Sequence, residues 1–141
     1  MRTMTEAEWV AFVSEGTRTG KLAVVRADGR PHVTPVWFVL DGTDLLFNTA
    51  ATSLKGKALR RDPRVSITVD DQVPPYSFVK IDGAAEIVDD LAELRRWATA
   101  IGGRYMGADR AEEFGERNGV PGELLVRVHP THVVAQRDIS L

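Results

Sequence analysis

The sequence predicts an antiparallel β-barrel with flanking helices, formed by one domain that spans residues 1–141. Apolar, β-branched segments follow one another along the chain, and Asp-Gly turns at Asp28-Gly29 and Asp41-Gly42 connect neighbouring segments as hairpins. Helical segments fill the gaps without the regular strand–helix alternation of a parallel sheet. The chain has 141 residues, of which 43% are hydrophobic, and this is the size and composition of one ordinary globular domain.

Two helices and three strands are predicted in the first half of the chain. Thr5 and Glu8 form the pattern of a capping box, and the apolar residues that follow predict an amphipathic helix to about Glu15. A second helix is predicted from Thr52 to Arg61, because the proline at position 63 disfavours helix in the residue before it. The strands are expected at residues 22–25, 30–40 and 45–48.

The second half of the chain is predicted to contain four strands and two helices. Its longest amphipathic pattern predicts a helix from Leu91 to Tyr105, broken near Gly102-Gly103. A shorter acidic helix is expected from Ala108 to Arg117. The strands are expected at residues 65–69, 78–88, 123–128 and 132–136.

Basic residues are concentrated in one short segment of an otherwise acidic chain. The net charge is −2, yet residues 52–64 carry five basic side chains against Asp62 alone. A local patch of this size suits a small anion, although a helix face charged for solubility would give the same pattern. Neither the net charge nor the placement of aromatic residues favours binding to nucleic acid.

Lys55 occupies an unusual place for a cation, close to the expected start of a helix. Either Thr52 or Ser53 can serve as the N-cap, so Lys55 opposes the helix dipole unless an anion binds there. A bound phosphate or carboxylate would remove this conflict. Gly56, which is unfavourable inside a helix, indicates close approach of a ligand or of another backbone segment. Lys55 and Lys57 lie about 200° apart around a helix, so both can contact one ligand only at the helix end.

The expected strand over residues 30–40 is apolar on both faces. Trp37 is interpreted either as core or dimer interface, or as a surface on which a flat aromatic cofactor stacks. Pro35 cannot donate to a neighbouring strand, so it belongs at an edge, at a bulge or beside a ligand. One face is expected to carry Val33, Pro35, Trp37 and Val39, and the other Thr34, Val36 and Phe38.

Several function classes lack the residues they need. The absence of cysteine excludes disulfides, thiolate zinc sites and a cysteine nucleophile. His129 and His132, three residues apart in a strand, are expected on opposite faces, so no metal site is predicted. There is no Gly-x-Ser-x-Gly motif and no phosphate-binding glycine loop. The longest apolar run has five residues, too few to cross a membrane, and a cytoplasmic location is expected.

Four segments follow one another in order along the chain: Gly20-Lys-Leu-Ala-Val-Val, Asp28-Gly-Arg-Pro-His-Val, Pro35-Val-Trp-Phe and Lys55-Gly-Lys-Ala-Leu-Arg-Arg-Asp-Pro-Arg64. This ordered set resembles the flavin/deazaflavin oxidoreductases, the pyridoxamine 5'-phosphate oxidase-like FMN-binding split barrels. The resemblance covers about residues 5–138 and is strongest to the branch that uses coenzyme F420, a deazaflavin, in actinobacteria. It implies a six-stranded antiparallel split barrel and a homodimer with two cofactor sites at the interface.

The resemblance also implies a cofactor site that binds F420, or alternatively FMN. Residues 34–37 would line the tricyclic ring, residues 48–50 would approach the ribityl chain, and the start of the second helix would bind the phosphate. Tyr76 matches a segment that often reaches the cofactor from the other subunit. The implied cofactor-binding residues are His32, Thr34, Pro35, Val36, Trp37, Asn48, Thr49, Ala50, Ser53, Lys55, Lys57, Arg60 and Tyr76.

The function implied is an F420H2-dependent reductase that transfers a hydride to a flat conjugated acceptor, quinone-like or biliverdin-like. The alternatives are an FMN-dependent oxidoreductase of the same fold and a non-catalytic flavin- or F420-binding protein. Related deazaflavin enzymes often have arginine where this chain has Ser53, so fewer phosphate contacts are expected here. The C-terminal Arg-x-His signature of pyridoxamine-phosphate oxidases is missing and the chain is short for one, so vitamin B6 oxidation is rejected. No catalytic side chain is identified. Lys57, Arg60, Arg61 and Arg64 are expected to meet the carboxylates of the F420 tail.

Overall fold

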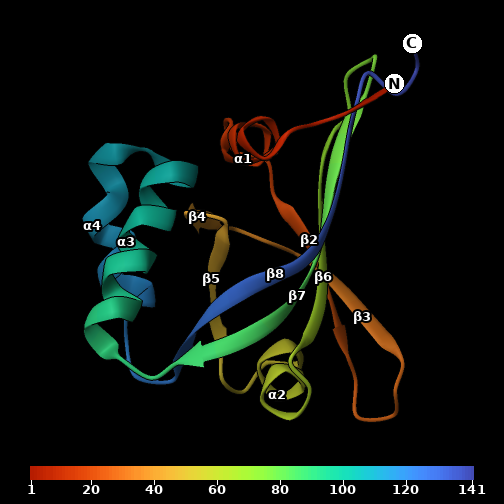
Figure 1. Ribbon diagram of the computed structural model, residues 1–141. Helices are drawn as coiled ribbons and strands as arrows, with labels where there is room; N and C mark the ends of the chain where they lie inside the picture. Colours follow the sequence, from red (N-terminus) through yellow and green to blue (C-terminus); the bar gives the residue numbers. More distant parts are fainter.

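Eight antiparallel strands form one sheet in the computed structural model, which describes residues 1–141 (Figure 1). The strand order is β3-β2-β6-β7-β8-β5-β4, and β1 pairs with β8. Six strands are long, and β1 and β4 are short additions, as expected for the split-barrel fold. The strands are β1 (Arg2–Thr3), β2 (Gly20–Val25), β3 (Pro31–Val36), β4 (Val39–Asp41), β5 (Asp44–Ala50), β6 (Arg64–Asp71), β7 (Ser77–Val88) and β8 (Glu123–Arg137).

Four α-helices surround this sheet. In Figure 1, α3 and α4 lie together on one side, α1 lies near the chain termini, and α2 lies at the opposite end. None of the helices is long and apolar enough to cross a membrane. The helices are α1 (Glu6–Ser14), α2 (Leu54–Arg61), α3 (Leu91–Met106) and α4 (Ala111–Asn118), and a 3-10 turn (Ala108–Arg110) precedes α4.

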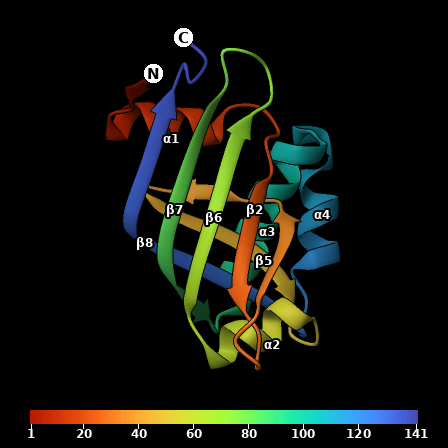
Figure 2. The same cartoon turned by 90° about the vertical axis from the view of Figure 1, so that its right-hand side faces the viewer.

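The long strand β8 gives the sheet its barrel shape. Figure 2 shows β2, β6, β7 and the C-terminal part of β8 side by side, with β4 and β5 crossing behind them. β8 pairs with β7 along most of its 15 residues and with β5 along its first part. The same strand therefore belongs to both walls of the barrel.

Side chains that alternate along the strands fill the barrel interior. Phe38, Phe47 and Ile67 are fully buried there, and α1 adds Trp9 and Val13 to the same cluster. This burial removes apolar surface from water and is the main stabilising contribution to the fold. A second, smaller cluster lies between α3 and the outer face of β5 and β8 and comprises Leu46, Leu94, Trp97 and Leu125.

Two local predictions are confirmed in detail. Thr5 caps α1: its hydroxyl accepts the Glu8 N–H at 3.2 Å, and the Glu8 carboxylate accepts the Thr5 N–H at 3.0 Å. The β2–β3 hairpin turns at Asp28-Gly29, where Gly29 has a φ of 86°, a conformation that favours glycine. Both features follow from local chemistry, which explains why sequence alone predicts them.

The predicted break in the long helix is wrong, because α3 continues without interruption to Met106. The two glycines serve instead for close packing against α4. A Cβ atom at Gly102 would overlap the side chain of Phe114, and one at Gly103 would approach Ala111 at 3.2 Å. The α3–α4 pair therefore forms a tightly packed second wall beside the barrel.

The last two predicted strands are one strand, β8, with an irregularity in its pairing. The register shifts opposite Asp82 and Gly83, so that His129 pairs with Ala84 while His132 pairs with Asp82. Both histidines therefore lie on the same face of the sheet, and the expectation of opposite faces is wrong. No group of three or more metal-ligating side chains lies close enough together to bind a metal ion.

The predicted strand over residues 30–40 is divided between β3 and β4. The two residues between them, Trp37 and Phe38, belong to neither strand. Thr34 and Val36 share the face of their partners Leu22 and Gly20, which points into the barrel, and Val33 lies on the outer face with 59% of its surface exposed. The Trp37-Phe38 link brings the chain to the candidate site.

Candidate functional site

A hollow of about 250 Å³ lies where the barrel meets α2 and the α3–α4 pair. The end of β3, the end of β5 and the first turn of α2 form one wall, and the two C-terminal helices form the other. Six of the thirteen residues implied by the family resemblance line it, together with two that the sequence did not indicate. The lining residues are Pro35, Val36, Trp37, Asn48, Thr49, Lys55, Ile101 and Asn118.

The first turn of α2 gives the hollow its positive character. Ser53 is the N-cap: its hydroxyl accepts the Gly56 N–H at 3.0 Å and donates to the Ala50 carbonyl at 2.7 Å. Of the four lysines, Lys21 and Lys80 form ion pairs, whereas Lys55 and Lys57 form none. Lys55 therefore brings an uncompensated charge to a helix N-terminus, an arrangement that favours an anion.

Gly56 is explained by another backbone segment. A Cβ atom at this position would overlap the carbonyl oxygen of Ala50 and would lie 3.2 Å from the Ala51 carbonyl oxygen. Of the two explanations that the sequence left open, close backbone approach is therefore the one observed. The close contact holds the α2 N-terminus directly against the end of β5.

Trp37 forms the aromatic side of the hollow. Its ring stacks on Tyr105 from α3, with centroids 5.1 Å apart and planes inclined by 4°, and it also meets Phe114 from α4 at 6.0 Å. The Tyr105 hydroxyl accepts the Phe38 N–H at 3.2 Å and donates to the Arg18 carbonyl at 2.8 Å. Burial raises the pKa of this hydroxyl, so Tyr105 stays neutral as a structural donor.

Arg104, the neighbour of Tyr105 on α3, ties three parts of the chain together. Its guanidinium donates to the carbonyls of Phe38 and Val13 at 2.7 Å and to that of Gly16 at 2.9 Å. The guanidinium also stacks over the ring of Phe38 at 4.7 Å. Burial lowers the pKa of Arg104, because its charge loses water without gaining a carboxylate partner. Arg104 thus fixes the Trp37-Phe38 link.

One buried polar atom next to the hollow has no partner. The Thr34 hydroxyl oxygen is inaccessible to water and makes no hydrogen bond. Thr34 directly precedes Pro35 and Val36, which line the hollow. Because Thr34 lies on the inner face of β3 with its partner Leu22 and its hydroxyl is closed off from solvent, this unpaired atom does not itself mark a ligand contact.

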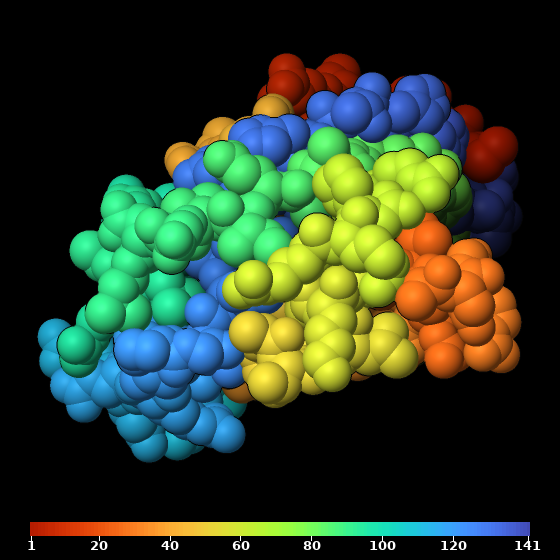
Figure 3. All heavy atoms as spheres, turned by 90° about the horizontal axis from the view of Figure 1, so that it is seen from below, coloured from red at the N-terminus to blue at the C-terminus, as the bar shows by residue number.

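Several implied residues lie outside this hollow. Arg60 lines a larger hollow of about 540 Å³, which Asp89, Asp90 and Glu123 also line. Tyr76 belongs to the connection between β6 and β7, and this connection lies at the opposite end of the molecule from α2 (Figures 1 and 2). Figure 3 shows α2 on the surface, between the β2–β3 hairpin and the segment that follows α4. The remaining implied residues outside the hollow are His32, Thr34, Ala50, Ser53 and Lys57.

Some basic residues of the segment 52–64 have hydrogen-bond or ion-pair partners within the chain. Arg64 pairs with Asp62 at 2.7 Å, and its hydrogen bond lowers the pKa of that carboxyl to about 2. Arg61 donates to the Val25 carbonyl at 3.2 Å. Lys57 and Arg60 are thus the two members of the run without a partner in the chain, and the contact of all four basic residues with an anionic tail stays a prediction.

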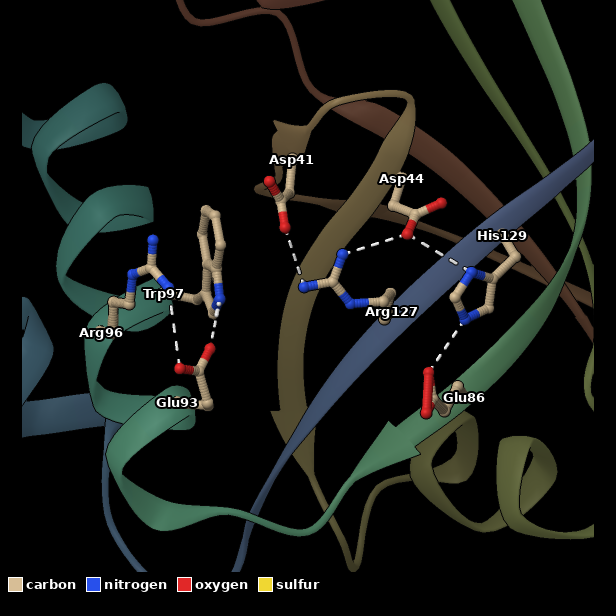
Figure 4. A network of polar contacts seen from close by, with 8 residues as sticks. All are labelled: Asp41, Asp44, Glu86, Glu93, Arg96, Trp97, Arg127 and His129. Carbon is tan, nitrogen blue, oxygen red and sulfur yellow. Dashed lines mark hydrogen bonds and ion pairs between the residues drawn. The ribbon is translucent and has the colours of Figure 1, made fainter.

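A separate polar network covers the outer face of β5, β7 and β8 (Figure 4). Arg127 donates to Asp41 and Asp44, each at 3.0 Å, and His129 lies between Asp44 and Glu86. Burial lowers the pKa of Arg127, but its carboxylate partners outweigh that effect and leave it raised. Because its charges are paired internally, this network does not resemble a binding site.

Comparison with known proteins confirms the family that the sequence resembled. A family model described as pyridoxamine 5'-phosphate oxidase matches residues 5–137. The chain belongs to the pyridoxamine 5'-phosphate oxidase-like split-barrel family. Split barrels of this family bind FMN or F420 and include flavin- and F420-dependent oxidoreductases.

Three solved structures are similar to this chain. The conserved hypothetical protein Rv2991 from Mycobacterium tuberculosis is 32% identical, with a TM-score of 0.85, and the match covers 98% of this chain and 89% of that one. An F420 reductase is 28% identical over 87% of this chain and 94% of its own, with a TM-score of 0.69. The heme storage protein HutZ from Vibrio cholerae shares the fold, with a TM-score of 0.75 over 98% of this chain and 100% of its own at 19% identity.

Proposed function

We propose that this protein is a reductase that binds reduced F420 and delivers its hydride to a flat conjugated acceptor. The observation that carries the proposal is the 250 Å³ hollow, in which an uncompensated Lys55 at a helix N-terminus faces the same space as the Trp37 ring. This pairing of an anion site with an apolar aromatic wall suits a phosphorylated tricyclic cofactor. Membership of a family that includes an F420 reductase supports the choice.

The residues present fit such a cofactor. Lys55 and the N–H groups of the first turn of α2 would hold its phosphate. Trp37 and Ile101 offer apolar surface for the ring. When bound, the deazaflavin supplies a hydride and leaves the chain to bind and orient.

The chain's own contribution is position and exclusion of water. Arg104 and Tyr105 hold the Trp37-Phe38 link, so the aromatic wall keeps one orientation as ligands enter and leave. The tightly packed α3–α4 pair closes the other side of the hollow. No side chain is assigned as the acid, because solvent can supply the proton to the reduced acceptor.

FMN is the second candidate cofactor, and one observation favours it. The free basic residues beyond the phosphate position are two rather than four, and the larger hollow beside Arg60 is lined by three carboxylates. An oligoglutamate tail gains less from such surroundings than the sequence suggested. FMN carries no anionic group beyond its phosphate, so it needs no basic residue beyond the first turn of α2.

We also propose that the active form is a homodimer. Tyr76 does not line the hollow and belongs to the β6–β7 connection at the end of the molecule opposite α2 (Figure 1), and the outer face of β3 leaves Pro31, Val33 and Pro35 exposed. A second copy of the chain would bring its own Tyr76 to the hollow and would cover the exposed outer face of β3. Light scattering at micromolar concentration should give a mass near twice 15.5 kDa. A mass of one chain at that concentration would contradict the shared site.

Turnover separates a reductase from a carrier protein. Reduced F420 is mixed anaerobically with the protein and with menadione or biliverdin as the acceptor, and the recovery of oxidised F420 absorbance is followed. We expect oxidation to be faster than in the same mixture without protein, and to depend on acceptor concentration. Tight binding of reduced F420 with no acceleration by either acceptor would contradict the reductase and leave a binding protein.

A further inference from the structure

A hydrogen bond between Asn48 and Glu123 separates the two hollows. The Asn48 side-chain amide donates to the Glu123 carboxylate at 3.1 Å. Asn48 lines the 250 Å³ hollow, whereas Glu123 lines the 540 Å³ hollow. The two residues come from paired strands, since Ala50 on β5 is the register partner of Glu123 on β8.

This bond fixes which end of the Asn48 amide is available to a ligand. An ionised carboxylate has only acceptor oxygens, so the Asn48 amide must present its NH2 group to Glu123. Its carbonyl oxygen Oδ1 is then left without a partner in the chain. Burial of both side chains to an intermediate degree strengthens the bond relative to water.

We infer that Asn48 binds an N–H group of the cofactor ring through Oδ1, and that Glu123 is the positioning residue that keeps Oδ1 turned to the ligand. This inference rests on the proposed function. FMN and F420 both carry an imide, a ring N–H between two carbonyl groups, which is the ligand chemistry that a single fixed acceptor recognises.

The other polar groups of the hollow do not supply this acceptor. The Thr49 hydroxyl donates to Ser53 at 3.1 Å, because the Ser53 hydrogen goes to the Ala50 carbonyl, and its oxygen is poorly placed for a ligand because Thr49 is buried, with 6% of its surface exposed. The Lys55 ammonium is only a donor. The Asn118 amide has no partner in the chain that selects one of its two ends. Asn48 is therefore the lining residue whose acceptor is held in place by a neighbour.

A methylated cofactor tests the N–H contact directly. FMN and N3-methyl-FMN are titrated into the wild-type protein and into Asn48→Leu. For the wild type, we expect methylation to weaken binding about fivefold or more, the equivalent of one hydrogen bond. Asn48→Leu should bind FMN about fivefold more weakly than the wild type and should lose most of its sensitivity to methylation. A merely structural role for Asn48 would not alter that sensitivity.

A charge swap tests the role of Glu123. Asn48→Asp places two carboxylates, at positions 48 and 123, opposite each other, and neither can donate a hydrogen bond. We expect this variant to bind F420 and FMN about tenfold more weakly. Adding Glu123→Gln restores a donor opposite the introduced carboxylate, leaves an acceptor for the ligand, and should bring affinity to within about threefold of wild type. The matched control adds Asp89→Asn to Asn48→Asp, which removes the same charge from the large hollow without a bond to position 48.

The outcomes separate this inference from the proposed function. Failure of the wild type to bind either cofactor contradicts the proposed function and the inference together. If the cofactors bind but wild type takes N3-methyl-FMN as well as FMN, or Asp89→Asn rescues Asn48→Asp as well as Glu123→Gln does, the inference alone is overturned. Thermal unfolding of each variant identifies any variant that does not fold. If the variants do not fold, the affinities of the wild type for FMN and N3-methyl-FMN still test the inference.

Discussion

Replacing Arg104 with alanine should lower the free energy of unfolding by about 3 kcal/mol and the melting temperature by about 10 °C. The substitution removes three charge-assisted hydrogen bonds and leaves the carbonyls of Val13, Gly16 and Phe38 without that donor. Bonds to a charged group contribute about 1.5–3 kcal/mol each, and the total is less than the sum because the three act together. Urea unfolding followed by tryptophan fluorescence measures the change.

Arg95 supplies the matched control for this substitution. It lies on the same helix, is exposed, and pairs with Glu116 across 3.5 Å at the surface. Exposed pairs of this kind contribute about 0–1 kcal/mol, so Arg95→Ala should leave stability nearly unchanged. If Arg104→Ala unfolds at the same urea concentration as Arg95→Ala, then Arg104 does not hold the Trp37-Phe38 link in the manner described.

Replacing Lys55 with alanine should weaken cofactor binding about tenfold to a hundredfold without unfolding the protein. Lys55 is the basic residue that lines the hollow, it has no carboxylate partner, and it lies in the first turn of α2. Removing a cation from a helix N-terminus relieves an unfavourable contact with the dipole, so stability should not fall. Fluorescence titration of F420 and FMN gives the affinities.

Lys57→Ala is the comparison for Lys55. Lys57 is exposed, lies outside the hollow, and can contribute only a solvent-screened contact. We expect a loss of about two- to fivefold, equivalent to one exposed ion pair. Equal effects of the two substitutions would mean that the anion binds along the outer face of α2 and not in the hollow.

Much of the fold could be predicted from sequence because the decisive signals are local. The capping box of α1 and the Asp28-Gly29 turn each depend on residues a few positions apart. The failures concern long-range packing. Gly102 resembles a helix break until Phe114 is placed against it, and the continuity of β8 depends on an irregular register with β7.

The candidate site likewise contains residues that the sequence indicated and residues that only long-range packing reveals. Lys55 was indicated by the conflict between its charge and the helix dipole, and Trp37 by a strand that was apolar on both faces. Tyr105 and Arg104 gave no such signal, because their partner Phe38 lies more than sixty positions away along the chain. The partners that withdraw Arg61 and Arg64 from the basic run also become visible only in the structure.

Parallel titration of F420 and FMN tests the central claim, that the hollow beside α2 is a deazaflavin site. Both cofactors share the phosphate and a flat tricycle, so discrimination depends on the carboxylates of the F420 tail. Two free basic residues, Lys57 and Arg60, can meet that tail, and exposed ion pairs contribute about 0.2–1 kcal/mol each. The titrations are made at low and high salt with wild type and with the Lys57→Ala, Arg60→Ala double variant.

At low salt we expect F420 to bind about five- to tenfold more tightly than FMN, with the preference shrinking at high salt and in the double variant. Lys55→Ala should weaken both cofactors alike, since both place a phosphate at α2. A preference for FMN that persists at high salt, or binding of F420 that is unaffected by Lys55→Ala, would contradict the account.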